Sequence, residues 1–246
     1  MSSAQAHVHA LMGVDRYFYL RCHGLAASEE ELRDLYRLRY AIYCEECGFL
    51  SADDYPDGLE IDSFDERSAQ FSAVNDDQEV VGTARLVLAS SDEADFPLMS
   101  HCPPEADFVV PPARESAEVS RLAVNRKYRR RKGDTLFGVN EEEIRKEPGA
   151  KDEVTGERRS NAPLLVLGLY REMYCYSREN GIRYWYAAME GSLARVLKFF
   201  GFNFVPIGPQ HDYYGPVRPY LGDLDVLEAQ LKASNPDLLA WFQSPL

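Results

Sequence analysis

The spacing of apolar residues after Ser28 predicts the first helix of the chain. Ser28 and Glu31 stand three positions apart, which is the pattern of a capping box at a helix N-terminus. Apolar residues then recur at helical spacing, and Gly48 is the expected end. These apolar positions are Leu32, Leu35, Leu38 and Ile42.

Short apolar runs elsewhere predict strands. We expect them at 17–21, 71–74, 79–88, 117–124 and 182–189. The acidic turn after the second run joins it to the third as a hairpin. The stretch 90–112 is predicted to be a polar connection.

The run 117–124 carries polar side chains among apolar ones. Because successive side chains of a strand point to opposite faces, Glu118 and Ser120 are predicted on one face and Arg121 on the other.

Helical patterns dominate the second half. Asn161 with Pro163 predicts the start of a helix that runs to Asn180, and its nearly all-round apolar beginning predicts burial. Shorter helices are expected at 192–200 and 224–231.

The order of elements predicts one α/β (α+β) domain over residues 1–246, with a mixed sheet. Within it, 1–14 is expected to lack regular structure, 133–160 to be an excursion, and 205–246 to be a C-terminal part specific to a family.

Composition narrows the class of protein. The hydrophobic fraction of 45% is ordinary for a globular chain, and no apolar run approaches the roughly 18 residues of a membrane helix. We therefore expect no stable membrane insertion and, without a signal-peptide pattern, a cytoplasmic location. The net charge of −13 disfavours nucleic acid as a partner.

The five cysteines do not predict a disulfide framework or a metal site. Cys44 and Cys47 form a single CxxC pair without further ligands at zinc-binding spacing. Two reduced thiols on a half-buried helix are the preferred interpretation, and no metal is expected.

Three charged clusters are candidates for chemistry. Glu60, Asp62 and Asp65 can hold a cationic substrate or orient an arginine, although the motif alone favours a solvated acidic turn. Glu118 can act as a base if its pKa is raised, or it can belong to a structural ion pair, and the segment alone favours neither.

The third cluster is a basic run that follows the predicted strand 117–124. It can bind phosphate or another anion, or it can be an exposed charged loop. Its members are Arg126, Lys127, Arg129, Arg130, Arg131 and Lys132.

The second and third clusters together resemble GNAT N-acyltransferases, in which a central strand leads into a loop that grips the acyl donor. The similar loop here is 130–135, with Thr135 where the family has a second small residue. The segment 193–202, ending in Gly201-Phe202, is similar to a later helix of that family.

Four motifs within 38–124 resemble the acyl-homoserine lactone synthases. They are Leu38-Arg39-Tyr40-Ala41-Ile42-Tyr43 with Gly48-Phe49, Glu60-x-Asp62-x-x-Asp65, Gly82-Thr83-Ala84-Arg85-Leu86, and Glu118-x-Ser120-Arg121. Phe49 stands where those synthases have a tryptophan near their S-adenosylmethionine site, which favours a different acceptor.

A sister group gives a longer resemblance, from about Phe18 to Tyr220. The PEP-CTERM/exosortase-associated acyltransferases, related to the long-chain N-acyl amino acid synthases, share three runs with this chain. They are Leu38 to Glu46, Tyr55 to Asp62, and Tyr214 to Pro219.

The resemblance implies a GNAT fold, with a central mixed, mostly antiparallel sheet flanked by helices. It also implies an N-acyltransferase that moves a long-chain fatty acyl group from acyl carrier protein or acyl-CoA to the amine of a small acceptor, an amino acid. These donors are co-substrates, and no bound cofactor is expected. Acidic acyl carrier protein would dock on the basic run.

The resemblance also assigns roles to residues. Glu118, with Ser120 and Arg121, would be catalytic. The acceptor site would comprise Arg39, Tyr43, Phe49, Glu60, Asp62, Asp65 and Arg85. The acyl-donor site would comprise Leu122, Ala123, Val124, Arg129, Arg130, Arg131 and Lys132.

Some alternatives remain open. Leu165, Leu167 and Leu169 can line an acyl tunnel, but a plain core is the preferred interpretation. The chain as a whole can instead be a lactone synthase that uses S-adenosylmethionine, a non-catalytic GNAT-fold binding module or, less favoured, an acetyl-CoA-dependent acetyltransferase.

Overall fold

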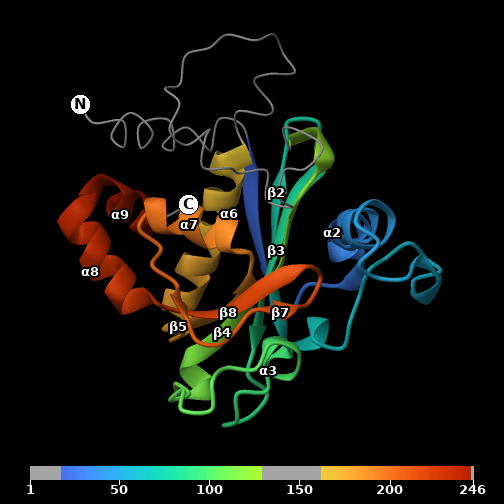
Figure 1. Ribbon diagram of the computed structural model, residues 1–246. Helices are drawn as coiled ribbons and strands as arrows, with labels where there is room; N and C mark the ends of the chain where they lie inside the picture. Colours follow the sequence, from blue (N-terminus) through green and yellow to red (C-terminus); the bar gives the residue numbers. More distant parts are fainter. Residues whose placement is uncertain (1–17, 129–161, 245–246) are drawn as a thin grey trace.

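The computed structural model describes residues 18–128 and 162–244 (Figure 1). The strands are β1 (Tyr19–Gly24), β2 (Ser68–Val74), β3 (Val80–Leu88), β4 (Ser116–Val124), β5 (Tyr184–Met189), β6 (Val205–Pro206), β7 (His211–Asp212) and β8 (Pro216–Asp223). The helices are α2 (Glu29–Tyr40), α3 (Pro97–His101), α6 (Ala162–Glu179), α7 (Gly191–Phe199), α8 (Leu224–Ser234) and α9 (Pro236–Gln243). A π-helix follows α2 at Ala41–Glu46, and short 3-10 turns lie at Ala52–Asp54, Asp65–Arg67, Ala113–Glu115 and Arg126–Tyr128.

The described strands form one mixed sheet in the order β1-β2-β3-β4-β5-β8-β6, with β7 paired to β8. Neighbouring strands are antiparallel except β4 and β5, which are parallel. Their pairing covers only three residues, from Ser116 opposite Tyr184 to Glu118 opposite Tyr186. The predicted mixed, mostly antiparallel sheet flanked by helices is confirmed.

Helices cover both faces of the sheet (Figure 1). Helix α6 packs on β1, β2 and β3, and α9 packs on α6. Helix α2 lies against the opposite face, on β3, and α3 contacts β5. The sheet is therefore the middle layer of three.

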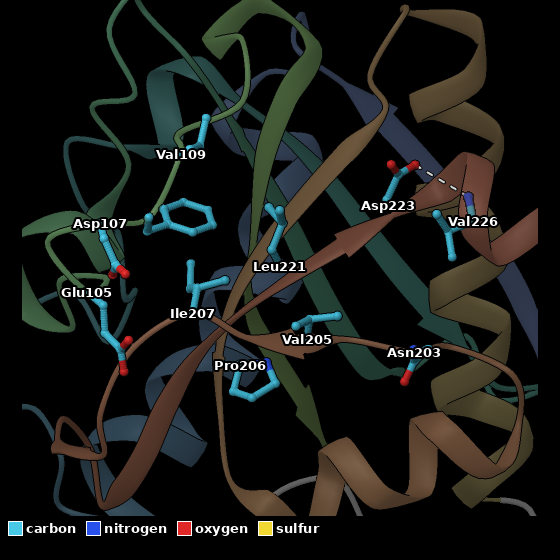
Figure 2. A pocket seen from close by; sticks show the side chains of 11 residues that line it. Glu105, Asp107, Val109, Asn203, Val205, Pro206, Ile207, Leu221, Asp223 and Val226 are labelled. Carbon is cyan, nitrogen blue, oxygen red and sulfur yellow. Dashed lines mark hydrogen bonds between the residues drawn. The ribbon is translucent and has the colours of Figure 1, made fainter.

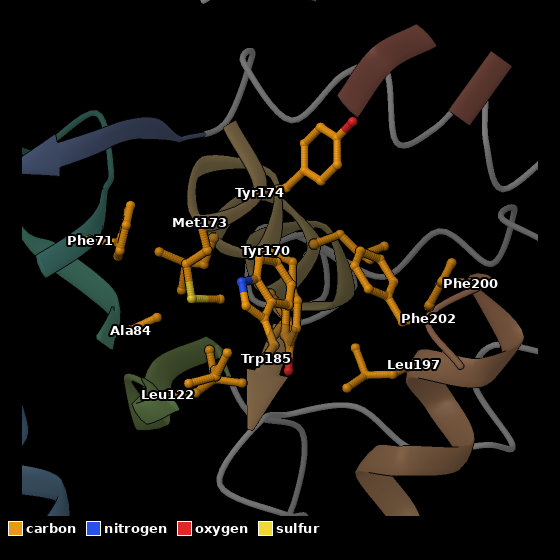
Figure 3. Close-up of a cluster of buried hydrophobic side chains, with 14 of the residues drawn as sticks. Phe71, Ala84, Leu122, Tyr170, Met173, Tyr174, Trp185, Leu197, Phe200 and Phe202 are labelled. Atoms are coloured by element: carbon orange, nitrogen blue, oxygen red, sulfur yellow. The ribbon is translucent and has the colours of Figure 1, made fainter. Parts of the chain in front are cut away.

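The main hydrophobic core lies between the sheet and α6. Aromatic rings fill much of it: Tyr170 contacts both Trp185 and Phe202, and Met173 is fully buried beside them (Figure 3). Leu165, Leu167 and Leu169 belong to the same core. The plain-core interpretation of this stripe therefore fits its burial.

Helix α2 begins as its sequence predicts. The Glu31 carboxylate accepts a hydrogen bond from the Ser28 N–H at 2.7 Å, and the Ser28 hydroxyl oxygen accepts one from the Glu31 N–H. After Tyr40 the helix widens into the π-helix, which turns Ile42 and Tyr43 inward before Gly48 changes direction at a φ of 62°.

Several elements escape prediction from the sequence. Helix α3 lies inside the expected polar connection, and β6, β7, β8 and α9 lie within 205–246, where only the helix 224–231 is predicted. Pro216 and Pro219 argue against a strand when read alone. Strand β8 forms because it pairs with β5 over 218–223 and so completes the sheet.

Candidate active site

The divergence of β4 from β5 after Glu118 creates a small pocket. It has a volume of about 90 Å³. The lining residues come from the π-helix, α3, β4, the end of β5 and the β7–β8 hairpin. They are Tyr43, Pro97, Glu118, Val119, Ser120, Arg121, Ala188, Met189, Glu190, Tyr213, Tyr214 and Val217. The three residues predicted to be catalytic therefore share one pocket.

Glu118 is a buried carboxyl group in the wall of this pocket. Only 3% of the residue is exposed, and its Oε2 accepts a hydrogen bond from the Leu98 N–H at 2.8 Å. Burial raises the pKa of Glu118 to about 7, against the opposing effects of the Leu98 bond, Arg85 and Arg121. The group is thus close to half-ionised at neutral pH.

Arg121 does not point where strict alternation predicts. Between Ser120, opposite Arg85, and Ala123, opposite Thr83, strand β4 contains one more residue than β3. Arg121 adopts a φ of 49° within this bulge. The extra residue reverses the alternation, so Arg121 lies on the same face as Ser120 and Glu118. The predicted opposite orientation is wrong.

A buried charge network lies behind the pocket. It joins three arginines, Arg39, Arg85 and Arg121, to three carboxylates, Glu60, Asp62 and Asp65. Arg39 donates to Glu60 and binds Asp65 through two nitrogens, at 2.7 and 3.0 Å. Formal charges in the network balance.

Arg85 and Arg121 link this network to the sheet. Arg85 binds Asp62 and Asp65 and donates from Nε to the Ser120 hydroxyl at 3.1 Å. Arg121 binds Glu60 and Asp62. The acidic run 60–65 therefore orients arginines and is neither a solvated turn nor a free cation site. Among the described residues, no group of acidic, histidine or cysteine side chains is arranged to hold a metal.

The network keeps its carboxylates ionised. Although burial opposes ionisation, Arg39 and Arg121 lower the pKa of Glu60 to about 2. Arg39 and Arg85 likewise hold the pKa of Asp65 far below its ordinary value. Charges fixed in this way form a rigid electrostatic wall at neutral pH.

The network residues differ in their access to a ligand. Arg39 and Glu60 are wholly buried, so they position their neighbours. Arg121 retains 10% and Asp62 22% exposure of their side chains, and Arg121 lines the pocket. Of the network residues predicted to bind the acceptor, Arg121 and Asp62 can therefore be reached by a ligand.

Aromatic rings close the other side of the pocket. The Arg121 guanidinium lies 5.2 Å from the centre of the Tyr43 ring, and Phe49 contacts Tyr43 at 6.4 Å. Tyr214 and Tyr213, on the β7–β8 hairpin, complete this side.

Sequence reasoning missed both hairpin tyrosines as site residues. The run Tyr214 to Pro219 is one of the motifs of the resemblance, and its Gly-Pro turn signal marks a hairpin. The sequence alone does not say that the tip of this hairpin meets β4.

The structure describes only part of the predicted acyl-donor site. Arg129, Arg130, Arg131 and Lys132 lie outside the described residues. The other three predicted donor-site residues are buried on the part of β4 that does not pair with β5. They are Leu122, Ala123 and Val124. Their predicted role in binding the donor stays a prediction.

A second hollow lies at the β6 edge of the sheet (Figure 2). It has a volume of about 500 Å³ and is mostly apolar, with Ile207 and Leu221 in its wall and Glu105 and Asp107 beside them. It shares no lining residue with the Glu118 pocket. The candidate chemistry therefore belongs to the smaller pocket.

Comparison with known proteins identifies the fold. Residues 38–138 match the family described as acetyltransferase (GNAT) domain. No curated protein matches the chain by sequence. No described helix is long and apolar enough to cross a membrane.

Several solved structures, including those of the acyl-homoserine lactone synthases LasI and BjaI, are similar in fold to this chain. TofI, in a ternary complex with an inhibitor and MTA, has a TM-score of 0.58 at 16% identity, covering 90% of this chain and 99% of its own. LasI has a TM-score of 0.57 at 18% identity, covering 85% and 90%. BjaI, a CoA-dependent acyl-homoserine lactone synthase with SAM and isopentyl-CoA, has a TM-score of 0.57 at 20% identity. The match covers 92% of this chain and 98% of the BjaI chain. These neighbours, together with the mixed sheet, show that the chain has the GNAT fold, and residues 38–138 are similar to the GNAT acetyltransferase domain family.

Proposed function

We propose that the chain is an N-acyltransferase that moves a long-chain fatty acyl group from acyl carrier protein or acyl-CoA to the amine of a small acceptor, an amino acid. The observation that carries the proposal is Glu118. It is a buried carboxyl group with a pKa raised to about 7, located where β4 and β5 diverge. A base with a pKa near the working pH is what proton removal from an amine requires.

The proposed reaction is a direct transfer. The acceptor amine attacks the thioester carbonyl while Glu118 takes its proton, directly or through one water. The C–N bond forms, the C–S bond breaks, and the proton held by Glu118 passes to the departing thiolate. Backbone N–H groups of 122–124, on the edge of β4 that does not pair with β5, are the proposed donors to the carbonyl oxygen, where negative charge develops.

Arg121 supports an acceptor that carries a carboxylate. Its Nε and Nη2 atoms donate to Glu60 and Asp62. Its Nη1 atom has no hydrogen-bond partner within the described ranges 18–128 and 162–244. A carboxylate bound there would lie in the same pocket as Glu118, which suits an amino acid.

The proposed donor carries a long acyl chain on a phosphopantetheine arm. Support comes from the basic run that continues beyond Lys127 and from the departure at Thr135, which suits the larger anionic surface of acyl carrier protein. Association with an exosortase system remains a proposal from the resemblance alone.

A product screen tests the proposal. Purified protein is incubated with long-chain acyl carrier protein or acyl-CoA and the common amino acids, and products are identified by mass spectrometry. We expect an N-acyl amino acid. Its rate of formation should fall about 100-fold or more in Glu118→Gln, and it should persist in Glu115→Gln, which removes an exposed carboxylate nearby. Equal product from wild type and Glu118→Gln would contradict the assignment of the base.

The second candidate is an acyl-homoserine lactone synthase. The fold similarity to TofI, LasI and BjaI over most of the chain favours it. Adding S-adenosylmethionine to the same screen separates the two. An acyl lactone with released methylthioadenosine would establish the synthase, and an acyl amino acid that forms without S-adenosylmethionine would exclude it.

A further inference from the structure

The tip of the β7–β8 hairpin has a strained, fixed geometry. The Tyr213 N–H donates to the Gly215 carbonyl at 2.9 Å. Tyr214 adopts a φ of 57°, and Gly215 one of 102°. A bulky residue in the left-handed region costs about 1–2 kcal/mol relative to glycine. The turn therefore retains a large ring at a position where a glycine would be relaxed.

Ring contacts fix the tip on both sides of the pocket. Tyr213 stacks on His101 of α3, with ring centres 4.5 Å apart and planes 7° apart. Tyr214 lies 5.6 Å from Phe49 and 6.4 Å from Tyr43. The hairpin thus spans from α3 to the π-helix region and closes the pocket above β4.

The two tyrosines share the pocket with Glu118 and Arg121. An amine presented to Glu118, with its carboxylate at Arg121, has its remaining substituent confined by these rings. The pocket volume of about 90 Å³ is smaller than the ~150 Å³ cavity that accommodates a benzene molecule. A side chain held within these walls is therefore expected to be smaller than a phenyl ring.

We propose that Tyr214, supported by Tyr213, is the specificity-determining wall of the acceptor site and restricts the reaction to amino acids with small side chains. This inference rests on the proposed function and deepens it. The ring of Tyr214 limits size, and the stack of Tyr213 on His101 holds the hairpin in place.

The test compares small and bulky acceptors in Tyr214→Gly. This variant removes the ring and also the backbone strain, so the turn retains its geometry. The kcat/KM for phenylalanine relative to alanine should rise about tenfold or more. Tyr214→Phe, which keeps the ring, should retain the wild-type ratio. Tyr19→Ala, which removes an exposed ring on the far edge of the sheet, should not change the activity.

Binding without donor gives a second readout. The ratio of Kd values for alanine and phenylalanine, measured by calorimetry, should shift by the same factor in Tyr214→Gly. A product from the wild type, with both ratios unchanged in Tyr214→Gly, would overturn the inference while leaving the transferase intact. A shifted ratio of Kd values without product from any acceptor would support Tyr214 as the wall of the site and contradict the proposed transferase activity.

Discussion

Glu118 shows at the scale of one residue how burial creates a base. The strand places the carboxyl group on a buried face of the sheet, where loss of hydration favours the protonated form. The hydrogen bond from the Leu98 N–H and the charges of Arg85 and Arg121 lower the pKa of Glu118, but they offset the effect of burial only in part. The group therefore titrates near neutrality, whereas Glu60, bound by two arginines, stays ionised.

The first prediction concerns the pH dependence of activity. Because Glu118 must be deprotonated to accept a proton and its pKa is raised to about 7, kcat/KM should rise about tenfold per pH unit below pH 7 and level off above it. Initial rates between pH 5 and 9 measure this profile. A profile that is flat between pH 5.5 and 7.5 would contradict Glu118 as the base.

The second prediction uses the same group as a measure of stability. In the unfolded chain a glutamate loses its proton near pH 4.5, but the folded chain retains it to about pH 7. The folded state therefore loses stability as pH rises through this interval, by about 3 kcal/mol. Glu118→Gln should remove this loss, so that its stability relative to wild type is higher at pH 8 than at pH 4.5.

Urea unfolding at the two pH values measures the difference, and Glu115→Gln is the matched control. An identical pH dependence in wild type and Glu118→Gln would show that Glu118 has an ordinary pKa. The result is independent of activity, since it requires only that the carboxyl group is buried.

At the scale of elements, the bulge in β4 decides which side chains meet. Sequence alternation places Arg121 away from Ser120, and the single extra residue at φ 49° reverses that. No pattern in the sequence indicates the bulge, because an arginine is not a residue that favours positive φ. The membership of the site was nevertheless predictable, because the motif contains every residue that the bulge brings together.

Elements with local signals were predictable, and elements defined by pairing were not. The capping box determines the start of α2, and Gly181 and Gly201 follow the ends of α6 and α7. Strand β8 and the β7–β8 hairpin depend on β5, which lies about thirty residues earlier, and prolines interrupt their periodicity. Tyr213 and Tyr214 were missed as site residues for the same reason.

The third prediction concerns the packing of β3 on α6. A Cβ atom at Gly82 would lie 2.4 Å from Leu165 Cδ2 and 3.3 Å from Leu169 Cδ1. Because both leucines are fully buried, Gly82→Ala should lower the free energy of unfolding by about 1–3 kcal/mol. Gly191→Ala, where the nearest atom is 3.5 Å away, is the control and should not be destabilising. Equal stability of the two variants would contradict the close packing.

At the scale of the whole molecule, the charge network joins four separate segments. Arg39 comes from α2, the carboxylates from the run 60–65, Arg85 from β3 and Arg121 from β4. The resemblance groups these residues at one acceptor site, but the sequence does not show which of them pair. Their mutual neutralisation follows only from the fold, which brings α2 and the acidic run over the same face of the sheet.

The fourth prediction tests this coupling. Glu60→Gln keeps the size of the side chain but leaves Arg39 and Arg121 with one carboxylate fewer inside the protein, so we expect a loss of about 3–5 kcal/mol at pH 7. The pKa of Glu60, lowered to about 2, means that this stabilisation is complete above pH 4.5 and disappears as the pH falls through about 2. The penalty of the variant should shrink in acid accordingly.

Asp92→Asn is the matched control, because Asp92 pairs with Arg114 on the surface, where the two side chains are 81% and 76% exposed. An exposed pair contributes little, so this change should cost less than about 1 kcal/mol. If Glu60→Gln were as mild as Asp92→Asn, the network would not be what holds α2 and the run 60–65 against the sheet. If the loss of stability in Glu60→Gln is large, the interactions that hold Arg121 in the pocket also stabilise the fold. Loss of Glu60 should then impair acceptor binding as well as stability.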